Sequence, residues 1–313
     1  MILTVTLNPA MDLMLFVDSF AFNTTNRVVR TERCIGGKGT HISHNLADLG
    51  VANTATGIAM GRTGEELVRV LKGAGVTCRF FTPEGGETRT NYALIDNAKN
   101  CTLISTKGPE LTKETLDAFL SLYRELVSGV TYVVISGDAS NFTDGKGVSL
   151  QAALFETAKQ NGAKVLLDAS GKSLEDCVKR SPYLIKPNVH ELAELTKLPV
   201  NTEREIIAAI ESLNPHRISV VAVSMGGEGS IVRYGAHYYK VSAAKVKVQN
   251  TIGCGDAYLS GLLYGMHSGM TPEDTLRFAA ACGGAEAESE RTVGLNKARV
   301  LALVDTINVQ KVV

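Results

Sequence analysis

The chain has 313 residues, of which 44% are hydrophobic and 20% are charged. This composition supplies enough apolar side chains for a large core and excludes a disordered chain. The 32 basic residues balance 32 acidic ones, which argues against nucleic acid or an anionic membrane as the main partner. We expect no transmembrane helix, because no run of roughly 18 apolar residues occurs. The first residues also lack the basic segment of a signal peptide.

The cysteines give information about the cellular compartment. All six are scattered, and no two form a C-x-x-C pair. This usage favours neither a disulfide framework nor a zinc site, so we expect a cytoplasmic protein with reduced thiols.

Strand-like and helix-like segments alternate along most of the chain. The expected strands are 2–7, 132–136, 164–168, 183–186 and 218–224, and the expected helices are 39–49, 113–127, 148–160, 189–196 and 203–213. Most of these strands are apolar without interruption, as in a parallel sheet that is covered on both faces. The alternation predicts right-handed βαβ units in a doubly wound, mainly parallel α/β sheet, and one domain over residues 1–313.

Two regions depart from this alternation. Residues 13–34 and 87–106 are rich in β-branched and aromatic side chains and have no helical period. They could form a small separate sheet, such as a lid made of about residues 12–34 and 87–106, or they could extend the main sheet. From Gly253 onward the chain becomes helical, and helices are expected over 256–267, 272–288 and 296–306.

The segment 250–256 reads NTIGCGD and precedes an amphipathic helix. Gly253 and Gly255 let the backbone approach a ligand closely, and the free N–H groups and dipole of the helix start favour an anion. An aspartate at that place repels an anion, but Asp256 is well placed to take a proton from a hydroxyl that attacks a bound phosphoryl group. The alternative is a glycine-rich turn in which Asp256 is an ordinary helix cap.

The segment 35–40 reads IGGKGT and also precedes a helix. Glu32 occupies the first glycine position of the pattern G-x-x-x-x-G-K-[ST], and Ile42 occupies the last glycine position of G-x-G-x-x-G. We therefore expect a turn that lets a ligand approach closely, and neither a P-loop nor a Rossmann loop.

Two further segments follow expected strands. The first, KPNVHE at 186–191, lies at a strand end, where open α/β sheets bind ligands. Glu191 could organise Mg²⁺ through water, or the segment could be an ordinary helix start with Asn188 as N-cap. The second, SMGGEG at 224–229, could hold a ligand against its backbone or could form a hairpin into residues 230–234.

Arginines in the two β-rich regions are candidate phosphate ligands. Arg27, Arg30 and Arg89 could bind a phosphate bidentately or could be solvated surface charges. His41 and His44 are three residues apart on one expected helix, which is more typical of surface residues than of a metal pair.

Together, in this order and spacing, these segments resemble the PfkB branch of the ribokinase-like kinases over nearly the whole chain. The resemblance is carried by TLNPAMD at 6–12, GGKG at 36–39, GETR at 86–89, KPNxxE at 186–191, VSMG at 223–226 and NTxGxGD at 250–256. The first and third motifs resemble the 1-phosphofructokinase and tagatose-6-phosphate kinase subgroup. The resemblance implies a ribokinase-like fold with an inserted β-sheet lid, ATP as phosphoryl donor with Mg²⁺, and a homodimer whose lids clasp each other.

The resemblance also implies roles for individual residues. Asp256 would be the catalytic base, with the backbone of Gly253, Cys254 and Gly255 as anion hole. The substrate would contact Asp12, Arg27, Gly36, Gly37, Lys38, His41, Arg89 and Asp138, with the two arginines on the phosphate that the sugar already carries. ATP would contact Lys186, Asn188, Ser224, Gly226, Gly229, Thr251, Gly253 and Gly255. Glu191, together with Asn188, would organise Mg²⁺, most simply through water.

Several positions depart from the family pattern. His41 and His44 replace the usual Asn and Arg, Asp138 replaces the usual Ser, Cys254 replaces Ala, and Ala93 stands where subgroup members often carry Lys. The changes cluster around the acceptor pocket and leave the phosphoryl-transfer residues intact, so we expect a kinase. The subgroup motifs, with Arg27 and Arg89, make a ketohexose monophosphate the expected acceptor, fructose 1-phosphate first and tagatose 6-phosphate second. The alternatives are a kinase of an unphosphorylated sugar or nucleoside, and a non-catalytic ligand-binding protein on the same fold.

Overall fold

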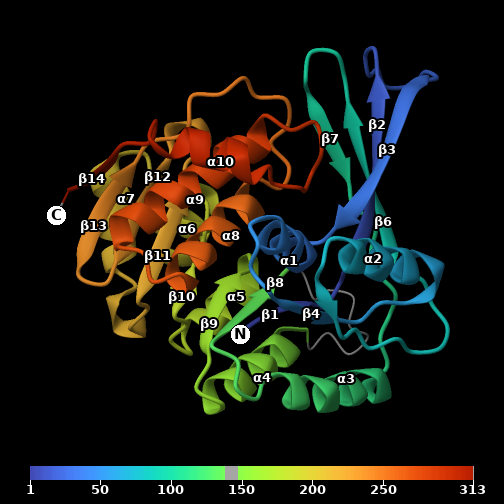
Figure 1. The fold of residues 1–313 in the computed structure, drawn as a ribbon, viewed down its shortest axis with the longest axis horizontal. Coiled ribbons are helices and arrows are strands. Elements are labelled where there is room, and N and C mark those ends of the chain that lie inside the picture. Colours follow the sequence, from blue (N-terminus) through green and yellow to red (C-terminus); the bar gives the residue numbers. More distant parts are fainter. Residues whose placement is uncertain (138–146, 313) are drawn as a thin grey trace.

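Two sheets of unequal size organise the computed structural model, which describes residues 1–137 and 147–312 (Figure 1). Within those residues the main sheet has ten strands. Their order is β14 (Val309–Lys311), β13 (His237–Val241), β12 (Ser230–Tyr234), β11 (Val220–Ser224), β10 (Leu184–Ile185), β9 (Lys164–Asp168), β8 (Tyr132–Ser136), β1 (Ile2–Thr6), β4 (Thr54–Gly57) and β5 (Thr77–Cys78). The strands from β5 to β11 pair in parallel, whereas β12, β13 and β14 are antiparallel.

Helices cover both faces of the main sheet. One face packs against α3 (Lys113–Leu126), α4 (Gly147–Gln160), α5 (Gly171–Val178), α6 (Val189–Thr196) and α7 (Glu203–Glu211), and the other against α1 (Lys38–Asp48), α8 (Cys254–His267), α9 (Pro272–Ala287) and α10 (Lys297–Val304). In β8, Val133 and Ile135 enter the first core, and Tyr132 and Val134 enter the second. Successive residues thus face opposite buried layers, which explains why the central strands are apolar without interruption. The doubly wound fold predicted from the sequence is confirmed.

The two β-rich regions form a sheet of their own. Its strands are β3 (Val28–Gly36), β2 (Ala10–Val17), β6 (Arg89–Ile95) and β7 (Cys101–Ile104), in that order. β2 runs parallel to β6, and the outer pairs are antiparallel. Both edges of β1 are already paired with β4 and β8, so the strand that follows β1 in the chain cannot join the main sheet beside it. Figure 1 shows this small sheet standing away from the main sheet.

Most expected helices and strands lie within about two residues of the observed ones, and the hairpin after residue 224 is present as β11 and β12. The helices α2 (Gly61–Gly73) and α5 were not predicted, and neither were the strands β4, β5, β13 and β14. α2 contains three glycines, which lowers its intrinsic helix propensity, and it is held by burial of Leu67 and Leu71. Within the described residues, no helix is both long and apolar enough to cross a bilayer.

Candidate active site

The start of α8 is formed by a glycine that no other residue could replace without a shift. Gly253 has φ = 82°, and a Cβ added to it would lie 2.1 Å from the carbonyl oxygen of Thr292. The first turn of α8 then consists of Cys254, Gly255 and Asp256. Backbone N–H groups of a first turn have no partner inside the helix, and the dipole makes this end positive. A positive helix start and Asp256, a residue that is only 7% exposed, therefore occupy the same place.

Asp256 has a charged partner on α1. The Nδ1 atom of His41 lies 2.7 Å from Oδ2 of Asp256, and its Nε2 atom lies 2.9 Å from the carbonyl oxygen of Ile35. Burial by itself lowers the pKa of His41, but the hydrogen bond and charge of Asp256, together with Asp12, raise it to about 9. His41 was expected to contact the sugar. The structure instead engages both of its ring nitrogens inside the protein.

The junction between the small sheet and α1 forms the other side of Asp256. A Cβ on Gly36 would lie 2.1 Å from Oδ1 of Asp12, so the glycine makes room for this carboxylate. Asn91 donates a hydrogen bond to the same oxygen at 2.8 Å. Burial raises the pKa of Asp12, while the charge of nearby His41 opposes the rise. Asp12, at 4% exposure, is thus held beside the His41–Asp256 pair.

A third buried carboxylate, that of Asp168, joins two lysines. Oδ1 of Asp168, at the carboxyl end of β9, lies 3.0 Å from Nζ of Lys38 and 3.7 Å from Nζ of Lys186. Burial raises the pKa of Asp168, but the two ammonium groups outweigh that effect and hold it below its usual value. A Cβ on Gly255 would lie 3.3 Å from Nζ of Lys186. Lys186 therefore adds positive charge directly beside the first turn of α8.

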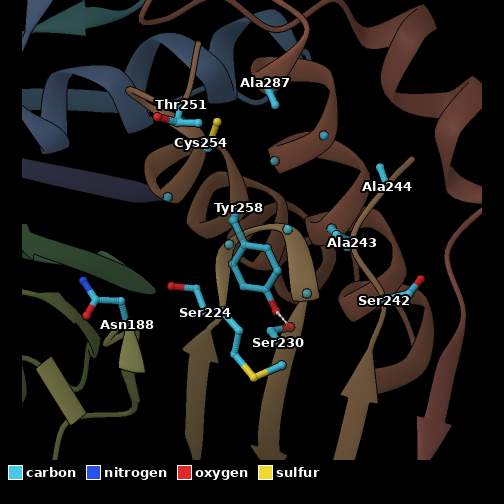
Figure 2. Close-up of a pocket in the computed structure, with 18 of the residues that line it drawn as sticks. Asn188, Ser224, Ser230, Ser242, Ala243, Ala244, Thr251, Cys254, Tyr258 and Ala287 are labelled. Carbon is cyan, nitrogen blue, oxygen red and sulfur yellow. Dashed lines mark hydrogen bonds between the residues drawn. The ribbon is translucent and has the colours of Figure 1, made fainter. Parts of the chain in front are cut away.

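A cavity of about 570 Å³ opens next to that turn (Figure 2). The expected ATP ligands in its lining are Asn188, Ser224, Gly226, Gly229, Thr251 and Gly255, joined by Cys254 of the expected anion hole. Its remaining wall is mostly apolar and includes Ala243, Ala244, Val246, Val248 and Ala287. Figure 2 shows Tyr258 in this wall, where its hydroxyl lies 2.9 Å from Ser230 Oγ. A polar end beside α8 and an apolar remainder suit a nucleotide, with phosphates at one end and base at the other.

Asn188 and Glu191 form a capping box at the start of α6. The Asn188 side chain accepts a hydrogen bond from the Glu191 N–H, and Oε2 of Glu191 accepts one from the Asn188 N–H, both at 2.9 Å. Oε1 of Glu191 has no hydrogen-bond partner among the described residues. The part of the chain that the structure describes contains no group of three acidic, histidine or cysteine side chains that could enclose a metal. One available carboxylate oxygen fits Mg²⁺, which keeps most of its water and binds few protein ligands.

Arg27 and Arg89 do not converge in one chain. Arg27 precedes Val28, which pairs with Val17 of β2, whereas Arg89 pairs with Ala10, seven residues along the same strand, and Asp12 lies five residues along it. At about 3.3 Å per residue, the backbone of Arg27 is roughly 23 Å from that of Arg89 and roughly 17 Å from that of Asp12. The expected clamp of two arginines on one phosphate is therefore not formed within the chain.

The guanidinium of Arg89 already has partners. It donates to Ser105 Oγ at 3.0 Å and to the carbonyl oxygens of Thr106 and Asn8 at 3.1 and 3.2 Å. Arg89 thus ties β6 to the end of β7 and to the segment before β2.

Asp138, the last expected substrate ligand, lies outside the described residues.

Three site residues were missed by sequence reasoning. Asp168 ends a strand of the parallel sheet, so the rule that ligands bind at such ends could have indicated it. Asn91 and Glu286 gave no such signal. Glu286 is 1% exposed in α9, and neither of its carboxyl oxygens has a hydrogen-bond partner among the residues that the structure describes. Burial raises its pKa to about 7, although the charge of His41 opposes the rise.

A cavity at the ends of parallel strands, next to the positive start of α8 and a buried carboxyl group, suits a phosphotransferase. The chain matches the pfkB family of carbohydrate kinases over residues 4–298, and it belongs to this family. It is therefore a sugar kinase.

Solved structures agree with this family over the full length. A provisional 1-phosphofructokinase of Thermotoga maritima is 28% identical, with a TM-score of 0.88 and coverage of 99% of both chains. A provisional phosphofructokinase of Staphylococcus aureus is also 28% identical, with a TM-score of 0.82 and coverage of 100% of this chain and 99% of that one. Phosphofructokinase-2 of Escherichia coli in complex with potassium has a TM-score of 0.89, 24% identity and coverage of 97% and 98%. At that identity the last likeness concerns the fold alone.

Proposed function

We propose that the chain is an ATP-dependent kinase of a ketohexose monophosphate, with fructose 1-phosphate as first acceptor and tagatose 6-phosphate as second. The observation that carries this proposal is the position of Asp256. Its carboxyl group lies between the Asp12 and His41 side chains and the start of α8, which borders the cavity lined by Asn188 and Ser224. A base between an acceptor pocket and a nucleotide pocket suits direct phosphoryl transfer.

The chemistry follows from the charges at this point. The acceptor hydroxyl attacks the γ-phosphorus of ATP while Asp256 takes its proton, and the bond from that phosphorus to the bridging oxygen breaks so that ADP leaves. N–H groups of Cys254 and Gly255 donate to the transferring group at the positive end of α8. Lys186, held by Asp168 beside Gly255, adds positive charge to the same place.

Mg²⁺ would be held at the start of α6. Glu191 offers Oε1 while its other oxygen maintains the capping box, and Asn188 lines the cavity. When bound, the ion neutralises charge on the phosphates of the nucleotide. Glu191 would orient the metal's water molecules and thereby the nucleotide.

The decisive test compares kcat/KM on fructose 1-phosphate, tagatose 6-phosphate, fructose 6-phosphate, fructose, tagatose and ribose, measured as ADP release. Asp256→Asn should lower kcat by about 10²–10⁴-fold because it removes the base and keeps the shape. Asp274→Asn is the matched control, since Asp274 occupies the same first-turn position in α9. Near-wild-type kcat in Asp256→Asn, or no sugar-dependent ADP release by the wild type, would contradict the proposal.

The contacts of Arg89 favour a second candidate, a kinase of an unphosphorylated sugar. At least three internal acceptors hold this guanidinium, and Arg27 lies far from Asp12. If Arg89 turns to a substrate phosphate, Arg89→Ala should raise KM for the sugar phosphate about 10-fold or more and leave KM for ATP unchanged. A preference for free sugars, with KM unaffected in Arg89→Ala, would establish the second candidate.

The small sheet fits the role of a lid that also joins two subunits. Arg30 of β3 contacts Glu290 at 2.8 Å, and Cys34 contacts Thr292 at 2.8 Å, so the sheet touches the loop beside α8. Its opposite face carries an apolar stripe of half-buried and exposed side chains, namely Leu13, Leu15, Tyr92, Leu94 and Ile104. A sheet face of this kind suits a second copy of the chain.

Introducing a charged side chain into the apolar stripe tests its role in dimer formation. Leu94→Arg should convert a dimer to monomers in sedimentation equilibrium. Leu301→Arg changes an exposed leucine of α10 and should leave the mass unchanged. A monomeric wild type would refute the lid-mediated dimer.

A further inference from the structure

The two ring nitrogens of His41 both face groups that accept hydrogen bonds. A carbonyl oxygen only accepts, so Nε2 must carry a proton that it donates to Ile35 at 2.9 Å. An ionised carboxylate also only accepts, so the 2.7 Å contact with Asp256 needs a proton on Nδ1 as well. An ionised Asp256 therefore requires His41 to be an imidazolium.

The surroundings of His41 favour the positive charge. Asp256 reaches it from α8, Asp12 from β2 and Glu286 from α9, and all three carboxyl groups are buried. The Ile35 carbonyl approaches from the end of β3. Burial of the ring opposes protonation, but the acidic groups outweigh it, and the pKa of His41 rises to about 9. The ring thus remains charged across the neutral range.

The contact leaves the two oxygens of Asp256 in different situations. Oδ2 is held by His41, whereas Oδ1 has no hydrogen-bond partner among the described residues. The Asp256 side chain keeps 10% exposure, so it is not sealed from a ligand. A base must present one oxygen within hydrogen-bond reach of the acceptor hydroxyl, and a fixed second oxygen restricts how the carboxylate can rotate.

We propose that His41 is the positioning residue of Asp256: as an imidazolium on α1 it holds Oδ2, so that Oδ1 is the oxygen that takes the proton of the acceptor hydroxyl. This proposal rests on the proposed function, because it assumes that Asp256 is the base. It gives His41 a role in orienting the base and not in contacting the sugar.

Kinetic tests separate positioning from general support of the fold. His41→Ala should lower kcat about 10- to 100-fold, with most of the loss in kcat and little in KM, since a charge-assisted hydrogen bond to the base is lost. His41→Asn can still donate a hydrogen bond and should recover part of the loss. His44→Asn is the matched control, because His44 lies on the same helix but does not contact Asp256. Its Nδ1 atom pairs instead with Oδ2 of Asp48, at 3.0 Å.

The pH profile gives a readout that a structural role would not move. The wild type should lose kcat as the pH rises through about 9, when His41 loses its proton. His41→Asn should lack this alkaline loss, and His44→Asn should keep it. Wild-type kcat and an unchanged alkaline limb in a folded His41→Ala enzyme would overturn the proposal.

A measurement without turnover guards against variants that misfold. Nitrogen NMR shifts of the histidine rings in the wild type should show both nitrogens of His41 protonated at pH 8, with titration near 9. In Asp256→Asn the titration of His41 should move to lower pH. A neutral His41 ring at pH 8 would overturn the proposal even where the kinase activity itself stands.

Discussion

Asp168 lies 3.0 Å from Lys38, although the two residues are 130 positions apart in the sequence. The same carboxylate oxygen is 3.7 Å from Lys186, which is only 7% exposed. Asp168 thus joins the first residue of α1 to the segment after β10, which leads to Asn188 in the cavity lining. The contact between Asp168 and Lys186 compensates the ammonium group of Lys186, which would otherwise be buried without an opposite charge.

We expect Asp168→Asn to destabilise the protein by about 3 kcal/mol, because removing one partner leaves a buried charge without compensation. It should also raise KM for ATP, since Lys186 loses the anchor that holds it beside Gly255. Chemical denaturation and steady-state kinetics measure the two effects. Asp176→Asn, which breaks an exposed pair with Lys179 at 3.9 Å, is the control and should change stability by well under about 1 kcal/mol.

Glu191→Gln should lower the affinity for Mg²⁺, or the Mg²⁺-dependent activity, by about 10–100-fold. The amide oxygen still accepts the hydrogen bond of the Asn188 N–H, so the cap persists while the charge is lost. Glu205→Gln makes the same change in an equivalent capping box on α7, formed with Thr202. If titration with Mg²⁺ gave the wild-type curve for Glu191→Gln, Glu191 would serve only as a helix-start residue.

Gly253→Ala should destabilise the protein by roughly 3 kcal/mol or more and abolish most activity, because the added Cβ meets the Thr292 carbonyl and the residue has a left-handed conformation. Gly269→Ala isolates the conformational part of this cost. Gly269 follows α8 with φ = 70°, and an added Cβ meets nothing within 4 Å. Its variant should lose only about 1 kcal/mol in thermal or chemical unfolding. Equal losses of unfolding free energy in the two variants would show that the close approach of residue 253 to the Thr292 carbonyl contributes nothing to the cost.

Stability should fall as the pH rises in two separate windows. Glu286 has a raised pKa of about 7 against an ordinary 4.5, so its stabilising contribution is complete below about 4.5 and is lost by about 7. His41 has a raised pKa of about 9 against 6.5, so its contribution is complete below 6.5 and is lost as the pH passes 9. Each loss is on the order of 3 kcal/mol, which corresponds to a shift of about two pKa units or slightly more.

Glu286→Gln tests the lower window. It should flatten the decrease in unfolding free energy between pH 5 and pH 7 and leave the decrease between pH 7 and pH 9. Denaturant unfolding at several pH values is the measurement. An unchanged slope between pH 5 and pH 7 would show that Glu286 is not held protonated by burial.

The sequence by itself determined the doubly wound core and the identity of Asp256, Gly253 and Asn188 as site candidates. Local physics suffices for these features, because uninterrupted apolar strands and a glycine before an amphipathic helix are short-range patterns. It left open whether the β-rich regions extend the main sheet. The tertiary structure decided this, because β4 and β8 occupy both edges of β1.

Only the tertiary structure decided which charged groups meet. His41 and Asp256 are 215 positions apart, and nothing local to either residue predicts a contact of 2.7 Å. The same holds for the contact of Asp168 with Lys38, and for the burial of the α9 residue Glu286 beside the site. Such pairs depend on how α1, α8 and the strand ends pack together, and packing is a property of the whole core. Hence the sequence indicated a kinase, whereas the fold specified how Asp256 is held.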